Sequence, residues 1–443
     1  MIICCGEALI DMVRVPVPGS GDTFMPIPGG CPYNTAIAIG RLGGAVKFLG
    51  RLSTDFFGEI LVKRLRDNRV GDELIIRSDQ NSTLAFVKLE KGKEPRYAFY
   101  TEGTADRSLR IEDLPPKLPA DTRCIIFGSI SLTMEPIASA IEALILREGT
   151  RKSVDQMDGA PVISFDPNIR PFMIKDRNAY TARFEKWIAA TTIAKISAAD
   201  FEFIYPKMDL EQALQKILAM GPRLVIGTRG AKGAVALLRR NDGNLIKVSA
   251  PSVDLPVVDT IGAGDAFHGA FITWLESKGK MSRSALANLS EADLYDALFF
   301  ANKAASIVCS RRGAEPPTRR EVESLKVQES KSGAPAKAGS AARPAVKQKT
   351  AAKPSKTAVK VPAKPAAKAV KTGAKSAAKP AVKHAAKPVS KPIAKPAAKP
   401  AKAPAAKTSA KPAQKPAVKN AAKPAPKPAA KTAAVQPKSG KKK

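Results

Sequence analysis

Residues 259–267, with the sequence DTIGAGDAF, combine small residues and carboxylates in a spacing that suits phosphate chemistry. An apolar run precedes this segment, and a helix-like stretch begins at about Ala266. We therefore expect Gly262, Ala263 and Gly264 to form the turn that enters a helix. Small residues let backbone N–H groups approach an anion there, and the helix dipole favours negative charge. A phosphoryl group in transfer needs such an environment.

Asp265 follows these small residues directly, so a carboxylate lies beside the expected anion site. It can accept the proton of a substrate hydroxyl while that oxygen attacks a phosphate. The same residue could instead act only as an N-terminal cap after a Gly-rich turn. The segment alone leaves both interpretations open, and the rest of the chain has to decide between them.

The elements that must position this segment alternate between short apolar runs and helix-like stretches. The expected strands are 2–5, 46–49, 124–127, 162–165, 193–196 and 224–226. The expected helices are 35–41, 57–68, 136–147, 180–191 and 210–220. Strands that alternate with amphipathic helices predict βαβ units and a mostly parallel sheet, which is the α/β class.

Two stretches, about 11–30 and 83–105, break this alternation. The first is rich in Pro and Gly, and the second alternates apolar and polar residues as a strand does. They could be two surface hairpins. They could also form a small β lid over the end of the sheet where ligands bind in open α/β proteins. Such a lid would exclude water from a phosphoryl transfer that must not become a hydrolysis.

The charge of the chain is distributed unevenly. Residues 331–443 contain 30 of the 73 Lys and Arg residues and none of the 40 Asp and Glu residues, so they carry 30 of the +33 net charge. The segment 326–443 consists mainly of Ala, Lys and Pro, without aromatic residues, and cannot bury enough apolar surface to offset ordering entropy. We expect one globular domain over 1–325 and a disordered basic tail over 326–443.

The tail has the composition of a polyanion ligand. Such a polycation attracts nucleic acid without sequence preference, and its affinity falls steeply with salt. Without aromatic side chains it has no platform on which bases could stack. Its composition resembles the Lys/Ala/Pro-rich tails of linker histones and of some bacterial nucleoid proteins. A solvating extension without any partner is the other interpretation.

Cysteine usage and hydropathy indicate the compartment. The five cysteines are odd in number, form no Cys-x-x-Cys pair, and fit neither a disulfide framework nor a zinc site. Glu7 and Asp11 interrupt the N-terminal apolar stretch, which argues against a signal peptide. The sequence contains no run of about 18 apolar residues, so it does not predict a membrane span. We expect a cytoplasmic protein, associated with the nucleoid if the tail binds DNA.

Two segments of the chain resemble the signatures of the PfkB, or ribokinase-like, carbohydrate kinase family. Residues 259–267 resemble the second signature, and residues 29–36 (GGCPYNTA) with 40–43 (GRLG) resemble the first. The resemblance covers about residues 1–325, and no Gly-x-x-x-x-Gly-Lys-Ser/Thr P-loop is present. It implies a Rossmann-like, mostly parallel sheet flanked by helices, with a small β lid.

The resemblance also implies roles for the residues around the expected anion site. The resemblance implies that Asp265 is the catalytic base and that Gly262, Ala263 and Gly264 form the anion hole. Asp11 matches the sugar-binding Asp of the family, and a carboxylate can accept hydrogen bonds from paired hydroxyls.

The first signature and residues 166–170 (DPNIR) supply the remaining sugar and phosphoryl contacts. Gly29 and Gly30 would let a sugar approach the backbone, and Asn34 could equally bind hydroxyls or cap a helix. The DPNIR segment resembles the fructokinase-like branch. It implies Asn168 as a substrate ligand and Arg170 as a phosphoryl ligand, although Arg170 could be a surface arginine.

Further positions resemble the ATP-binding elements of the family. Ser197 and Asp200 stand where the family has an Asn-x-x-Glu element that organises Mg²⁺ and phosphate, and this departure weakens the Mg²⁺ assignment. Thr228 and Gly230 resemble the nucleotide-binding loop, or they belong to an ordinary loop.

A monovalent cation, K⁺, is implied by the resemblance of Asp259 and of Gly313, in the loop 310–314, to the family's cation site. Lid strands in this family often pair between subunits, so the resemblance also implies a homodimer.

The implied reaction is ATP-dependent phosphorylation of a sugar primary hydroxyl, with D-fructose as the first choice. Other acceptors that stay open are 2-keto-3-deoxygluconate, ribose and ketoses other than fructose. A protein of another class also stays open, namely a nucleic-acid-associated protein that reuses the kinase fold.

Overall fold

Buried apolar strands build a nine-stranded sheet with the order β13-β12-β11-β10-β9-β8-β1-β4-β5. The strands from β11 to β5 in this order pair in parallel, and β12 and β13 add in antiparallel fashion at one edge. They are β1 (Ile2–Cys5), β4 (Val46–Ser53), β5 (Val70–Ser78), β8 (Cys124–Gly128), β9 (Val162–Asp166), β10 (Ile193–Ser197), β11 (Leu224–Thr228), β12 (Ala234–Arg239) and β13 (Leu245–Ala250). The six strands expected from the sequence are all present, which confirms the α/β class.

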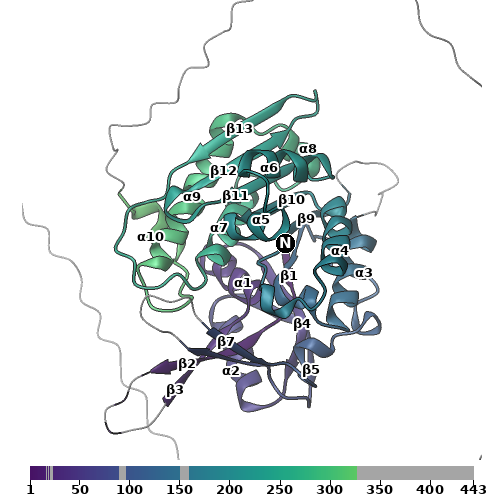
Figure 1. Ribbon diagram of the computed structural model, residues 1–443, viewed down its shortest axis with the longest axis vertical. Helices are drawn as coiled ribbons and strands as arrows, with labels where there is room; N and C mark the ends of the chain where they lie inside the picture. The colour runs from purple at the N-terminus through teal and green to yellow at the C-terminus, as the bar shows by residue number, and fades with distance from the viewer. Residues whose placement is uncertain (16, 18, 20–22, 89–95, 150–158, 327–443) are drawn as a thin grey trace, which may run out of the picture. The chain divides into compact units, whose positions relative to one another are not determined.

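The computed structural model describes residues 1–15, 17, 19, 23–88, 96–149 and 159–326. The predicted tail, 326–443, lies outside the described residues except for its first residue. The description below therefore concerns the N-terminal unit, which contains both sheets (Figure 1).

Helices cover both faces of the large sheet, which explains why its central strands are apolar on both sides. Ile2 and Cys4 of β1 pack on one face, and Ile3 and Cys5 pack on the other. The first face carries α1 (Cys31–Arg41), α2 (Phe56–Asp67), α7 (Ala263–Ser277), α8 (Arg283–Ala287), α9 (Glu291–Cys309) and α10 (Arg319–Ser324). The second carries α3 (Ile137–Gly149), α4 (Arg177–Ala190), α5 (Ala198–Ile204) and α6 (Leu210–Ala219) (Figure 1).

Short 3-10 turns complete the helical structure: η1 (Asp106–Ser108), η2 (Ile111–Asp113), η3 (Ser129–Thr133), η4 (Pro171–Met173) and η5 (Gly230–Lys232). Within the ranges that the structure describes, none of the helices combines the length and the hydropathy that a bilayer crossing needs.

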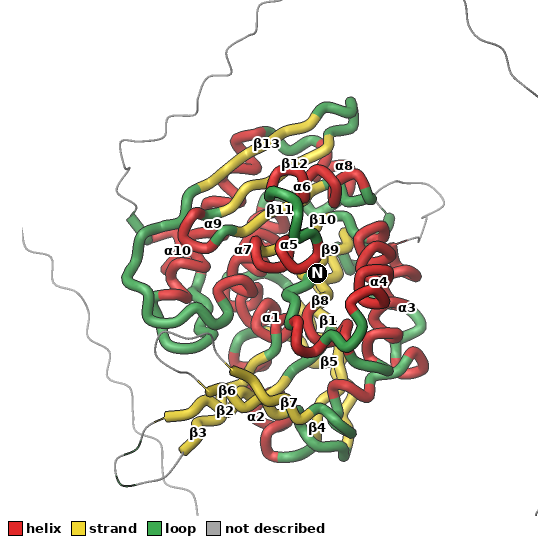
Figure 2. The backbone as a smooth tube through the Cα atoms, in the orientation of Figure 1, coloured by secondary structure: helices red, strands yellow, loops and turns green. Residues whose placement is uncertain are grey.

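A separate four-stranded sheet with the order β3-β2-β6-β7 forms the lid (Figure 2). Its strands are β2 (Leu9–Val15), β3 (Thr23–Gly29), β6 (Leu84–Lys88) and β7 (Arg96–Tyr100). Strands β2 and β6 pair in parallel. This pairing joins the two segments, about 11–30 and 83–105, that interrupt the alternation of strands and helices along the chain. The alternative of two separate hairpins is therefore wrong. Of the expected lid segments, residues 16, 18, 20–22 and 89–95 lie outside the described residues.

The chain reverses its direction across the sheet next to β1, which lies between β4 and β8. In open α/β sheets, ligands bind at such a switch point, beyond the carboxyl ends of the strands. Gly128 ends β8, Asp166 ends β9 and Ser197 ends β10, so these residues mark the edge where the site is expected.

Candidate active site

Helix α7 begins at Ala263, about three residues before the start that the sequence suggests. Its N-cap is Gly262, whose φ of 76° lies in the left-handed region that favours glycine. A β-carbon at Gly262 would lie 2.5 Å from the β-carbon of Ala314, so the 310–314 loop packs against this turn. The N–H of Ala263 donates a long hydrogen bond of 3.3 Å to the carbonyl oxygen of Thr260. The N–H groups of Gly264 and Asp265 have no partner within the helix and are available to an anion.

Asp265 lies inside this first turn and is only 7% exposed. Its Oδ2 accepts a hydrogen bond of 2.9 Å from Nδ2 of Asn34, and the Cys31 thiol also donates to its carboxylate. Burial raises the pKa of Asp265, and these two hydrogen bonds oppose the shift. Since Gly262 is the N-cap, the interpretation of Asp265 as the helix cap is wrong.

Asn34 belongs to α1, whose N-cap is Gly30. The interpretation of Asn34 as a helix cap is therefore also wrong, because its side chain reaches across to Asp265 on α7. These two residues are 231 positions apart in the sequence. A β-carbon at Gly30 would lie 2.7 Å from the carbonyl oxygen of Glu7, which explains the glycine at this close approach.

A buried ion pair lies beneath the first turn of α7. Nζ of Lys195, on β10, is 2.7 Å from Oδ2 of Asp166, and the two side chains are 5% and 2% exposed. A β-carbon at Gly264 would lie 3.1 Å from the same Nζ. Burial acts to lower the pKa of Lys195, but the charge of Asp166 and its hydrogen bond raise that pKa overall. A positive charge is thus held directly behind the expected anion hole.

His268, one turn further along α7, contacts the same ion pair. Its Nε2 is 2.7 Å from Oγ of Ser164, and its Nδ1 is 3.9 Å from Oδ2 of Asp166. Burial, together with the charge of Lys195, lowers the pKa of His268 to about 3. The imidazole is therefore neutral and packs beside the site.

Glu7, immediately after β1, fixes the start of α1. Its Oε1 accepts a hydrogen bond of 3.1 Å from the backbone N–H of Cys31, and its Oε2 accepts one of 3.3 Å from the N–H of Ser131. Burial raises the pKa of Glu7 to about 7, against the effect of hydrogen bonds that include those from the Ser131 hydroxyl and the Cys31 N–H. This carboxyl group ties the first signature to the loop after β8.

The lid brings Asp11 of β2 to the same place. A β-carbon at Gly29 would collide with the Asp11 carboxylate, so the glycine leaves room for this side chain. Burial raises the pKa of Asp11 to about 7, while the charge of Arg170 opposes the shift and that of Asp265 adds to it. The carboxylate of the lid therefore lies in the electrostatic field of both the expected base and Arg170.

Asn168 and Arg170 are bound to each other. Nη1 of Arg170 donates to Oδ1 of Asn168 at 2.7 Å, and Asn168 adopts a left-handed φ of 38°. The charge of Arg170 acts on Asp11 at the lid. Contacts of Asn168 with substrate and of Arg170 with phosphate stay predictions.

Ser197 and Asp200 form a capping box at the start of α5. Oδ2 of Asp200 accepts from Ser197, and its Oδ1 accepts a hydrogen bond of 2.7 Å from the N–H of Ile169. The pair therefore joins α5 to the 166–170 segment. Direct Mg²⁺ binding by Asp200 would have to compete with these bonds, so the arrangement gives little support to this expectation.

Thr228 and Gly230 lie at the neighbouring strand end. Thr228 pairs in register with Ser197, and a β-carbon at Gly230 would meet no described atom within 4 Å. This open edge leaves space for a nucleotide, although nucleotide contact stays a prediction.

Asp259 and Gly313 come together as expected. Oδ2 of Asp259 accepts a hydrogen bond of 2.9 Å from the N–H of Gly313, and its Oδ1 accepts one of 3.1 Å from the N–H of Ile261. The contact uses backbone donors rather than the carbonyl oxygens that a cation needs, and K⁺ binding stays a prediction.

Sequence reasoning missed four side chains of this site: Glu7, Cys31, Asp166 and Lys195. A signal existed for Lys195, since a lysine within a buried apolar strand is rare unless it is paired. The strand Ile193–Ser197 is such a run. No comparable signal marked Cys31, because its importance comes from the contact with Asp265.

The fold and the site together define a class: an α/β kinase without a P-loop, with a buried carboxylate in the first turn of a helix and a β lid. The model of the pfkB family of carbohydrate kinases matches residues 1–320. The chain therefore belongs to the pfkB carbohydrate kinase family.

Three fructokinases are similar to this chain. A fructokinase from Rhizobium leguminosarum bv. trifolii is 38% identical over 294 residues, which are 66% of this chain and 85% of the relative. The crystal structure of a Xylella fastidiosa fructokinase with bound ATP matches with a TM-score of 0.64 and 27% identity, over 73% of this chain and 97% of the other. A Vibrio cholerae O395 fructokinase with bound fructose, ADP and calcium ion matches with a TM-score of 0.61 and 25% identity, over 73% and 97%.

Proposed function

We propose that this protein is a fructokinase that transfers the γ-phosphoryl group of ATP to the 6-hydroxyl of D-fructose. The observation that carries the proposal is the placement of Asp265. Its carboxylate lies in the first turn of α7, held by Asn34 and in the electrostatic field of Asp11 on the lid. The kinship with fructokinases makes fructose the first acceptor to test.

In the proposed mechanism, the sugar lies between the lid and the switch point of the sheet. Asp11 accepts hydrogen bonds from sugar hydroxyls, and Gly29 and Gly30 let the sugar approach the backbone. Nδ2 of Asn34 orients Asp265, while its Oδ1 accepts no hydrogen bond from any described residue and is available to a hydroxyl. Asp265 then removes the proton of the 6-hydroxyl as its oxygen attacks.

The phosphoryl group meets positive charge and backbone donors on the opposite side. The N–H groups of the turn 262–264 bind its oxygens, and Lys195 holds a positive charge behind them. Arg170 adds a second cation at the lid side. The ATP body lies along Ser197, Asp200, Thr228 and Gly230. Mg²⁺ bound to the ATP phosphates would neutralise part of their charge.

ADP release against a panel of sugars tests the proposal. Purified protein is supplied with Mg²⁺, K⁺ and ATP, and fructose, 2-keto-3-deoxygluconate, ribose and adenosine are offered as acceptors. Phosphorus NMR then shows which oxygen of the product carries the phosphate. Fructose is expected to give the highest kcat/KM with phosphate on O6. A higher value for another acceptor would replace the substrate, and no turnover with any acceptor would refute the kinase assignment.

A dimer through the lid is part of the proposal. The lid exposes Phe24, Met25 and Tyr100, which are 36%, 39% and 62% exposed. Phe24 and Tyr100 both contact Phe86 and so lie on one face of the lid, and an exposed apolar face favours association. Light scattering of the wild type should give twice the chain mass, and Tyr100→Glu should shift the equilibrium to the monomer. A monomeric wild type would contradict this arrangement.

The basic segment supports a second proposal, namely nonspecific binding of nucleic acid or another polyanion in the cytoplasm. Residues 331–443 contain 30 Lys and Arg residues and no acidic residue, and this composition carries the proposal. Deletion of 331–443 should abolish retention on DNA while kcat and KM for fructose barely change. Retention by the wild type should also weaken steeply with salt. Loss of kinase activity in the truncated chain would show that the segment belongs to the enzyme.

A further inference from the structure

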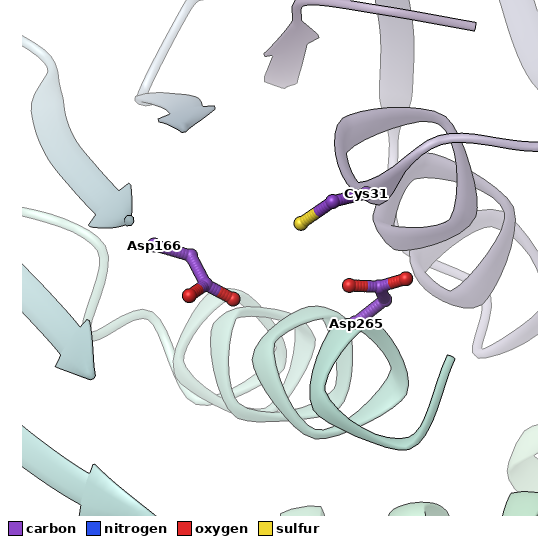
Figure 3. A group of neighbouring side chains, drawn as sticks. All are labelled: Cys31, Asp166 and Asp265. Carbon is purple, nitrogen blue, oxygen red and sulfur yellow. The ribbon is translucent and has the colours of Figure 1, made fainter. Parts of the chain in front are cut away.

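Three potential metal ligands meet in the site, and one of them is the proposed base. The thiol of Cys31, a carboxylate oxygen of Asp166 and one of Asp265 all lie within 4.8 Å of one another. They come from the start of α1, the end of β9 and the first turn of α7 (Figure 3). Across the described ranges, no other set of three His, Cys, Asp or Glu side chains converges in this way.

Asp166 offers this cluster an oxygen that has no partner. Its Oδ2 receives Lys195, but its Oδ1 accepts no hydrogen bond from any described residue, although Asp166 is only 1% exposed. Figure 3 shows the carboxylate turned towards Cys31 and Asp265. A buried carboxylate oxygen without a partner is costly, and a bound cation would satisfy it.

We propose that Cys31, Asp166 and Asp265 form a site for a thiophilic divalent cation such as Zn²⁺, and that its binding inhibits the kinase. The inhibitory part rests on the proposed role of Asp265 as the base. A cation on this carboxylate would prevent it from accepting the proton of the sugar hydroxyl. The metal site itself does not depend on that role.

The ligand set discriminates between metals. Zn²⁺ is held by thiolates and carboxylates at about 2.0–2.3 Å, commonly with three protein ligands and one open position. Mg²⁺ prefers oxygen ligands only and keeps several waters, so a thiolate disfavours it. The site should therefore bind Zn²⁺ in the presence of the Mg²⁺ that accompanies ATP.

The charges around the site balance when a dication binds. The Cys31 thiol releases its proton to solvent as the metal–sulfur bond forms. A thiolate, two carboxylates, the Lys195 ammonium and a divalent cation then have no net charge, and His268 is neutral. Cys31 and Asp265 are each 7% exposed and Asp166 is 1% exposed, so the cation would reach the site past Cys31 and Asp265.

The other cysteines provide the control. Cys4, Cys5 and Cys124 are fully buried in the sheet, whereas Cys309 is more exposed than Cys31. If metal ions bound thiols of this protein by accessibility alone, Cys309 would be the site. Cys309→Ala is therefore the variant matched to Cys31→Ala.

Cobalt absorption tests the site without any substrate. The nucleotide-free protein is titrated with Co²⁺, whose thiolate complex gives a charge-transfer band in the near ultraviolet, and Zn²⁺ is then added to displace it. The wild type and Cys309→Ala should show the band at one Co²⁺ per chain, and Cys31→Ala should lose it. Cys31→Ser, which keeps the size of the side chain, should lose it as well and guards against misfolding of the alanine variant.

Inhibition is measured separately, as the Zn²⁺ concentration that halves the activity of each variant relative to its own rate with Mg²⁺ and without Zn²⁺. Cys31→Ala should need at least about tenfold more Zn²⁺ than Cys309→Ala. An undiminished band in Cys31→Ala, or loss of the band in Cys309→Ala, would overturn the site. Equal Zn²⁺ sensitivity of the two variants would overturn the inhibitory role. The absorption result is valid whether or not fructose is the acceptor.

Discussion

Removal of the Lys195 ammonium should destabilise the protein strongly. Lys195→Met leaves the Asp166 carboxylate, whose side chain is 2% exposed, without the partner that lies 2.7 Å away. Breaking a buried pair by removing one charge costs about 3–5 kcal/mol, because the other charge stays buried. We expect a loss of this size in the free energy of unfolding.

A surface pair of similar geometry provides the control for this prediction. Lys247 lies 2.6 Å from Glu211, but these side chains are 47% and 55% exposed. Lys247→Met should therefore cost at most about 1 kcal/mol, since solvent screens such pairs. Distance is nearly the same in the two cases, so the difference measures the effect of burial.

A double variant tests the physical reason. Lys195→Met combined with Asp166→Asn leaves no buried charge in this pair, and replacement of both partners by neutral groups is often nearly neutral for stability. Urea unfolding followed by circular dichroism gives the free energies of all four proteins. If Lys195→Met costs no more than Lys247→Met, or if the double variant is less stable than Lys195→Met, the reasoning about this ion pair is refuted.

Two further predictions concern packing and pH. Gly128→Ala should destabilise the protein by about 3 kcal/mol or more, because the new β-carbon would overlap the backbone carbonyl of Asp166. Gly103→Ala is the control: Gly103 has a φ of 67° and open space around it, so this variant should cost only about 1–2 kcal/mol. Thermal melts compare the stability of the two variants. Since the pKa of Glu7 rises from 4.5 to about 7 in the folded protein, the folded state holds this proton more tightly and stability should fall as pH rises from about 4.5 to 7. Glu7→Gln should reduce this loss of unfolding free energy between pH 4.5 and 7 by about 3 kcal/mol. If denaturation curves show the same dependence of stability on pH in the variant, the raised pKa of Glu7 is contradicted.

The elements of the fold were predictable because they depend on local pattern. Apolar runs of strand length and helical periodicity predicted the strands and helices that carry the site. The lid was predictable as β structure, but the parallel pairing of β2 with β6 that joins it was not. That pairing depends on tertiary contacts between segments far apart in the chain.

The site was predictable in its motifs and not in its contacts. The sequence predicted that Asp265 and Asn34 belong to the site, but their hydrogen bond depends on how α1 packs on α7. The capping role of Ser197 and Asp200 could have been predicted, because Ser-x-x-Asp before a helix is a capping pattern.

The central claim is that Asp265 accepts the proton of the sugar hydroxyl, and Asp265→Asn tests it most directly. Asparagine keeps the shape and polarity of the side chain and removes the basic carboxylate. Single-turnover phosphorylation of fructose is compared with the wild type, and ATP and fructose binding are measured by calorimetry. Binding should change little, while the rate should fall by about 10²–10⁴-fold, which is the usual contribution of general-base catalysis. A rate within about tenfold of the wild type would contradict the account.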